Sequence, residues 1–248
     1  MHTEYHKWYS PSLNKDMELK VYGHGGKPIL VFPAQGGRFF EFEDFQMVAQ
    51  SQWFLDNGIV QFFTVDSVDL ESWANEGAAP WDRGRRHEEY DRYIMNEVVP
   101  FIRHKNGSHH IFTTGVSMGG YHSGNFFFRH PDVFDGVISL SGLFQLDLFI
   151  GDYMDETVYF NSPLHFLPNL NDERVLNDYR RSHIIVCCGT GAWEDAMIKD
   201  ITALRGILEH KGVPAWIDLW GHDVNHDWPW WRKQFPYFLG KLHESGAI

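Results

Sequence analysis

The sequence predicts an α/β fold with a mostly parallel central sheet and helices on both faces. Short apolar runs rich in β-branched and aromatic residues alternate along the chain with longer stretches of helical periodicity. The middle runs are almost continuously apolar, as expected of strands buried on both faces. With 248 residues, 43% of them hydrophobic, the chain is long enough to bury a full core.

Seven apolar runs are expected to form the strands. They cover residues 17–23, 28–33, 60–65, 110–115, 136–141, 183–188 and 215–220. Five stretches between or after them are expected to be helices. These cover residues 42–57, 87–104, 119–130, 196–211 and 229–243. The clearest is 196–211, where six apolar residues recur at helical spacing, Asp195 is a suitable N-cap and Gly212 a stop.

Residues 143–181 break the alternation with two prolines and mixed polarity. We expect them to form an insertion of short helices over one end of the sheet, too small for a separate domain. Residues 1–248 are therefore expected to form a single domain that carries a short helical insertion.

Charge and composition exclude several classes of partner. The formal net charge is -12 and no block of Lys and Arg occurs, which argues against nucleic acid and anionic membranes. No segment resembles a signal peptide or a membrane span, so a cytoplasmic protein is expected. The only cysteines, Cys187 and Cys188, are adjacent in an apolar run. Strand geometry points their side chains to opposite faces, which favours buried packing over a disulfide.

The stretch GVSMG, residues 115–119, places Ser117 between an expected strand and an expected helix. G-x-S-x-G in this context is typical of a nucleophile elbow, in which a strained turn projects the serine oxygen into a cleft. Glycines are required because bulkier neighbours would clash with the strand or the helix. The alternative is an ordinary serine in a strand-to-helix turn.

A nucleophilic serine needs a histidine as base and an acid to orient it, in the order serine, acid, histidine for this type of elbow. The polar loop before the last helix offers His222 and His226, and its position favours His226. A metal site that combines the two histidines with Asp223 and Asp227 is the alternative for this loop.

Glu194 and Asp195 are the adjacent candidates for the acid, in the loop after residues 183–188. A role as helix cap accounts for Asp195, so Glu194 is favoured, with Asp195 as the alternative. For the oxyanion hole we expect the N–H groups of Met118 and of Gln35, the latter in a loop with Gly36 and Gly37. Either neighbour of Gln35 remains an alternative.

Aromatic residues make up 16% of the chain, which exceeds what a core of this size needs. Some are expected to line a pocket or a subunit contact, so a homo-oligomer stays open. We expect Gly36, Trp73, Trp81 and Trp228 to shape the binding site of a small-molecule substrate.

With these motifs, the chain resembles the esterase family of α/β-hydrolases, which includes esterase D-like S-formylglutathione hydrolases and, more remotely, mycobacterial mycolyltransferases. The shared segments are GVSMGG, most of residues 70–102, GLFQL and the C-terminal GHDVNHDWPWWRKQFPYFL. The terminal H-x-W-x-x-W spacing, with His226, Trp228 and Trp231, is the most specific. It favours His226 over His222. The esterase D subgroup usually shows G-x-x-D at the acid, whereas counting from Gly191 leads to Glu194.

This resemblance implies an α/β-hydrolase fold and hydrolysis of small carboxylic esters through an acyl-serine intermediate, without a cofactor. Acyl transfer or thioester hydrolysis with the same triad is one alternative. A binding protein that keeps the fold without turnover is another. A metal-dependent hydrolase would use His222 and His226 and would be inhibited by chelators.

Overall fold

The computed structural model describes the whole chain, residues 1–248, and contains one eight-stranded sheet with the order β1-β2-β4-β3-β5-β6-β7-β8. The strands are β1 (Thr3–Ser10), β2 (Lys15–Tyr22), β3 (Lys27–Phe32), β4 (Val60–Val65), β5 (Ile111–Val116), β6 (Phe134–Leu140), β7 (His183–Cys188) and β8 (Trp216–Leu219). All pairs from β4 to β8 are parallel, and only β1–β2 and β2–β4 are antiparallel. The mostly parallel sheet expected from the sequence is confirmed.

Strand β1 was not expected from the sequence. Its residues alternate between exposed and half-buried positions, and it pairs with β2 along its whole length. As an edge strand it is polar on one side, so it lacks the continuous apolar run that marks the central strands. Trp8 on β1 packs against Tyr93 and Phe101, which ties the edge of the sheet to a long helix.

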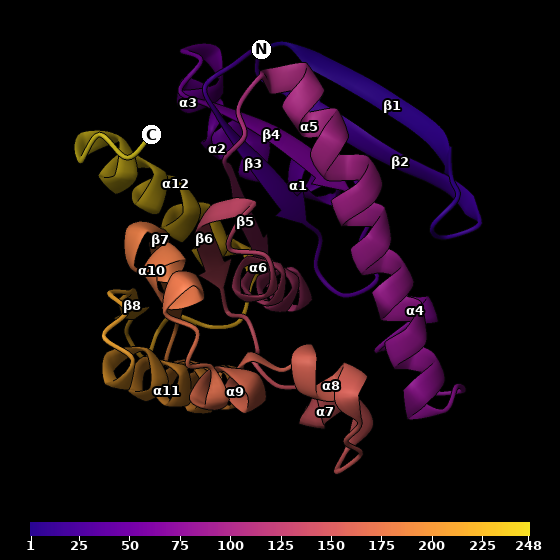
Figure 1. Cartoon of the computed structure of the whole chain (residues 1–248). Helices are drawn as coiled ribbons and strands as arrows, with labels where there is room; N and C mark the ends of the chain where they lie inside the picture. The colour runs from indigo at the N-terminus through magenta and orange to yellow at the C-terminus, as the bar shows by residue number, and fades with distance from the viewer.

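That long helix consists of three consecutive parts and starts earlier than the expected 87–104. The parts are α4 (Pro80–Tyr93), the π-helical turn η2 (Ile94–Val98) and α5 (Val99–Asn106). Pro80 fits the first helical position because its missing N–H would have no helical partner there. Gly107, with φ +84°, ends the helix. The continuous rod is visible beside β1 and β2 in Figure 1.

The single helix expected over residues 42–57 is wrong. Three short helices occupy this region, α1 (Glu41–Asp44), α2 (Met47–Gln50) and α3 (Gln52–Asp56). Gln46 has φ +66°, a left-handed conformation that a continuous right-handed helix cannot contain. The break lets Phe42, Met47 and Val48 all pack into the core on this side of the sheet.

Both faces of the sheet are covered, and the remaining helices agree with the sequence within one or two residues. These are α6 (Met118–Arg129), α11 (Asp195–His210) and α12 (Trp228–Glu244). Helices α5, α6 and α11 contribute to the core on one face, and α2, α3 and α12 to the core on the other. Cys187 belongs to one core and Cys188 to the other, both as free thiols, which confirms their expected opposite orientation.

Residues 143–181 form a series of short helices. They are α7 (Asp147–Ile150), α8 (Glu156–Phe160), α9 (Pro163–Phe166), the 3-10 turn η3 (Leu167–Asn169) and α10 (Glu173–Arg181). Figure 1 shows α7, α8 and α9 grouped beside α11 at one end of the sheet. No helix of the chain combines the length and the apolar character needed to cross a membrane.

Candidate active site

Ser117 lies in a sharp turn between β5 and α6, with φ 57° and ψ -118°. A Cβ on Gly115 would come within 2.4 Å of the Gly119 backbone, and one on Gly119 within 2.3 Å of the Phe32 carbonyl oxygen. Glycine at both positions therefore lets strand, turn and helix approach closely enough to form the elbow. A strained non-glycine residue at such a turn is typical of a functional site.

Three side chains meet at this turn. His226 Nε2 lies 2.8 Å from Ser117 Oγ, and His226 Nδ1 lies 3.3 Å from Glu194 Oε2. Because a carboxylate only accepts, Nδ1–H donates to Glu194 and Nε2 is left to accept the Ser117 hydroxyl proton. The Glu194 side chain is fully buried, whereas that of His226 is 16% exposed. A hydroxyl, an imidazole and a carboxylate are thus connected in series.

The competing candidates lie elsewhere. His222 is exposed, and its Nδ1 lies 3.2 Å from the Thr190 hydroxyl. Asp195 is also exposed and is the first residue of α11. It does not cap this helix as expected, because Glu194 occupies the cap position and makes no capping hydrogen bond with its side chain. Nowhere do three or more His, Cys, Asp or Glu side chains gather in a way that could hold a metal ion, so the four candidates in the 222–227 loop do not form a set.

Two loops that are bonded to each other hold the acid and the histidine. The Gly191 N–H donates to the Val224 carbonyl at 2.9 Å, and the Ala192 N–H to Asn225 Oδ1 at 2.8 Å. The His226 N–H in turn donates to the Ala192 carbonyl at 3.0 Å. These bonds fix the histidine loop relative to the loop that ends in Glu194.

Within residues 34–37 of the loop after β3, one N–H group has no acceptor. The Ala34 N–H donates to Glu41 Oε2 at 2.7 Å, the Gly36 N–H to Asp69 Oδ2 at 3.3 Å, and the Gly37 N–H to the Ala34 carbonyl at 2.8 Å. The N–H of Gln35 has no partner in the protein. Met118, which directly follows Ser117, is the first residue of α6, where N–H groups have no acceptor within the helix.

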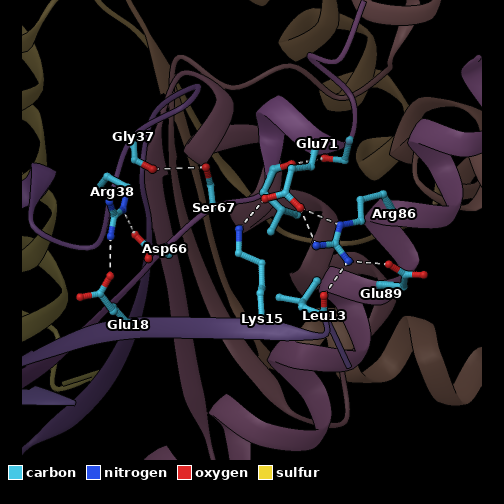
Figure 2. A network of polar contacts seen from close by, with 12 residues as sticks. Leu13, Lys15, Glu18, Gly37, Arg38, Asp66, Ser67, Glu71, Arg86 and Glu89 are labelled. Carbon is cyan, nitrogen blue, oxygen red and sulfur yellow. Dashed lines mark hydrogen bonds and ion pairs between the residues drawn. The ribbon is translucent and has the colours of Figure 1, made fainter. Parts of the chain in front are cut away.

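Charged side chains hold the loop after β3 in place. Asp69 is fully buried and also lies 2.7 Å from His122 Nε2. Burial raises the pKa of Glu41, and the nearby Asp69 carboxylate adds to this shift. Figure 2 shows Arg38 between Glu18 and Asp66, and the Ser67 hydroxyl donating to the Gly37 carbonyl. The backbone around Gln35 is thus held on both sides.

The expected substrate-binding residues differ in exposure. Trp73 is fully buried in a small apolar cluster with Met118, so it packs beside the residue that follows Ser117 and is not exposed to a substrate. Trp81 on α4 is 58% exposed, and its ring lies 6.2 Å from that of Tyr153 in the insertion. Gly36 has φ +68° and faces the side chain of Leu70. Trp228 stacks on Phe45 with ring centroids 4.1 Å apart.

Sequence reasoning missed Ser141, which directly follows β6. Its hydroxyl lies 2.6 Å from Glu194 Oε1, on the side of the carboxylate opposite His226. The Trp231 indole N–H donates to the same hydroxyl at 3.0 Å. The available signal was position, because polar residues at the carboxyl ends of neighbouring parallel strands meet at one edge of the sheet.

Comparison with known proteins assigns the chain to a family. The model of the esterase family, described as "Putative esterase", matches residues 10–242. No curated protein is similar enough to this chain to count as a relative.

Solved structures share the fold at low identity. A ferulic acid esterase has a TM-score of 0.75 and 17% sequence identity, over 96% of this chain and 95% of its own. An S-formylglutathione hydrolase from Staphylococcus aureus has 0.71 and 16%, over 97% and 96%. MPT51 from Mycobacterium tuberculosis has 0.72 and 13%, over 98% of both chains. The family match covers nearly the whole chain and confirms the resemblance seen in the sequence: the protein belongs to the esterase family of α/β-hydrolases and is a serine hydrolase of carboxylic esters.

Proposed function

We propose that Ser117 is the nucleophile, His226 the general base and Glu194 the residue that orients His226. The observation that carries this assignment is the pair of contacts on one imidazole, 2.8 Å to Ser117 Oγ and 3.3 Å to Glu194 Oε2. His226 takes the hydroxyl proton as Ser117 Oγ attacks the ester carbonyl carbon. It then gives that proton to the departing alkoxide, and water releases the acyl group from Ser117 by the same steps.

The oxyanion of the tetrahedral intermediate is bound by the N–H groups of Met118 and Gln35 in this proposal. Gln35 is favoured over its neighbours because the N–H groups of Ala34 and Gly36 already donate to carboxylates. Two fixed donors aimed at the developing charge are worth several orders of magnitude in rate.

An apolar cluster adjoins the elbow. Met118, which follows Ser117, packs with Trp73, Leu143, Leu146 and Val158, all buried. Partly buried aromatic side chains of the insertion, Phe149 and Tyr153, adjoin this cluster. We therefore infer that the preferred substrates are small esters whose acyl group is apolar or aromatic.

A fluorophosphonate probe, which reacts with activated serines, tests the assignment. Intact mass and peptide mapping are expected to show one adduct, on Ser117, that is absent in Ser117→Ala and strongly slowed in His226→Ala. His222→Ala is the matched control and should label as the native protein does. Folded native protein that stays unlabelled, or that is labelled on another serine, would exclude this nucleophile.

Kinetics with graded esters complete the test. Ser117→Ala and His226→Ala should each lower kcat by several orders of magnitude, as in other triads. Competing alcohols in the same assay separate hydrolysis from acyl transfer, because transfer yields a new ester instead of the free acid.

A further inference from the structure

The Ser141 hydroxyl connects the candidate acid to an aromatic residue of the last helix. Trp231 Nε1 lies 3.0 Å from Ser141 Oγ, which lies 2.6 Å from Glu194 Oε1. An indole N–H only donates, so the Ser141 oxygen accepts from Trp231. The single proton of the hydroxyl is then donated to Glu194. The direction of both hydrogen bonds, from Trp231 to Ser141 and from Ser141 to Glu194, is therefore fixed.

The backbone of Ser141 is strained. Its φ is +50°, in the region that favours glycine, and the residue is fully buried. Its N–H donates to the Cys187 carbonyl at 2.7 Å, which holds the end of β6 against β7. Glycine would fit this backbone with less strain but would supply no hydroxyl. A strained, buried serine beside the acid points to a role for its side chain.

We propose that Ser141 and Trp231 are positioning residues that hold the Glu194 carboxylate in the orientation that His226 requires. This inference rests on the proposed function of Glu194. Three groups donate to the fully buried Glu194 carboxylate: the His226 imidazole at 3.3 Å, the Gly189 N–H at 3.4 Å and the Ser141 hydroxyl at 2.6 Å. The bond from Ser141 is the shortest of them. In a water-poor environment such a bond is stronger than in water, so it restricts the orientation of the carboxylate.

Trp231 also contacts the base directly. Its ring meets that of His226 nearly at right angles, with centroids 5.0 Å apart. One side chain thus packs against the histidine and, through Ser141, acts on the acid. This accounts for the second tryptophan of the H-x-W-x-x-W motif, which the triad alone leaves without a role.

Few other titratable groups face Glu194. These are His226 from its loop and the two cysteine thiols of β7. Burial raises the pKa of both thiols, that of Cys188 to about 12, so both are neutral near pH 7. Apart from His226, no cation compensates the carboxylate, and its stabilisation depends on neutral donors such as the Ser141 hydroxyl.

The test compares Ser141→Ala, Trp231→Phe and the double variant with native protein. Ser141→Ala should lower kcat about 10- to 100-fold, the range expected when a hydrogen bond to a charged group is lost, with KM nearly unchanged. Ser51→Ala is the control, because Ser51 is a fully buried serine whose hydroxyl donates only to the Met47 carbonyl.

Trp231→Phe keeps an aromatic ring against His226 and removes only the indole N–H. It should cause a smaller loss than Ser141→Ala, and the loss should nearly vanish in the Ser141→Ala background, since Trp231 acts on Glu194 through that hydroxyl. If the losses in kcat of the two single variants add up in the double variant, Trp231 does not act through Ser141 and the proposal is overturned.

Proton NMR gives a readout that needs no substrate. The imidazole proton bonded to Glu194 should give a downfield resonance in native protein that shifts or broadens in Ser141→Ala and persists in Ser51→Ala. An unchanged resonance, together with an unchanged kcat, would overturn the proposal. Absence of esterolysis in native protein that shows this resonance would instead count against the proposed function alone.

Discussion

Three residues at the candidate active site have positive φ values that residues other than glycine rarely adopt. They are Ser117, Ser141 and Trp193, with φ 57°, 50° and 69°. Such conformations cost about 1–2 kcal/mol each and persist only where the surroundings fix them. For Trp193 the fixing elements are the bonds of Gly191 and Ala192 to the histidine loop, which leave the indole 83% exposed. Three of the strained backbone positions thus lie at the candidate active site.

The adjacent acids allow a matched test at this scale. Glu194→Gln should lower kcat by about 10³- to 10⁴-fold, because an amide no longer compensates the imidazolium that forms in the reaction. Asp195→Asn should change kcat less than about twofold, since Asp195 is exposed and makes no contact with His226. Steady-state kinetics of both variants with one ester decides the point. A larger loss in Asp195→Asn would reverse the assignment.

At the scale of elements, the sequence predicted helices best where a single apolar face packs on the sheet. Helices α11 and α12 follow this rule; they and α6, which is buried all round, start within a residue or two of their expected positions. Residues 42–57 carry enough apolar side chains for one helix, but contacts with the core break them at Gln46. Strand β1 depends on pairing with β2, a contact that no local pattern encodes.

The loop after β3 should be sensitive to a single methyl group. A Cβ on Gly37 would lie 2.4 Å from a Glu41 carboxylate oxygen, so Gly37→Ala should push that carboxylate away from the Ala34 N–H. We expect kcat to fall about tenfold or more with little change in KM, because the Gln35 donor is then less well placed. Gly25→Ala is the control, since no atom lies within 4 Å of its added Cβ. Equal kcat values for the two variants would contradict this role of the loop.

At the scale of the whole molecule, buried ionisable groups make stability depend on pH. His87 is fully buried and stacks on His122 with ring centroids 5.5 Å apart. Burial, and then the charge of His122, hold the pKa of His87 well below its usual range. Below about pH 6.5 the unfolded chain therefore binds a proton at this residue that the folded chain does not.

Stability should accordingly fall as the pH drops below about 6.5, with up to about 1.4 kcal/mol per pH unit lost from His87. Denaturant unfolding between about pH 7.5 and 5.5 measures this slope. His87→Gln removes the titrating group and keeps a polar side chain near Asn125, so its slope should be shallower, whatever its absolute stability. Equal slopes would show that other groups dominate.

The sequence by itself determined the fold class, the elbow around Ser117 and the choice of His226. These features rest on local pattern, namely apolar periodicity, glycine spacing and position before the last helix. Only the tertiary structure decided which of two adjacent carboxylates faces the histidine, which N–H of the 34–37 loop is free, and that the Ser141 hydroxyl lies beside Glu194. The physical reason is that His226 and Ser117 are 109 positions apart, and Ser141 and Glu194 are 53 apart. Contacts at such separations arise from the parallel sheet, whose strand ends bring distant loops to one edge.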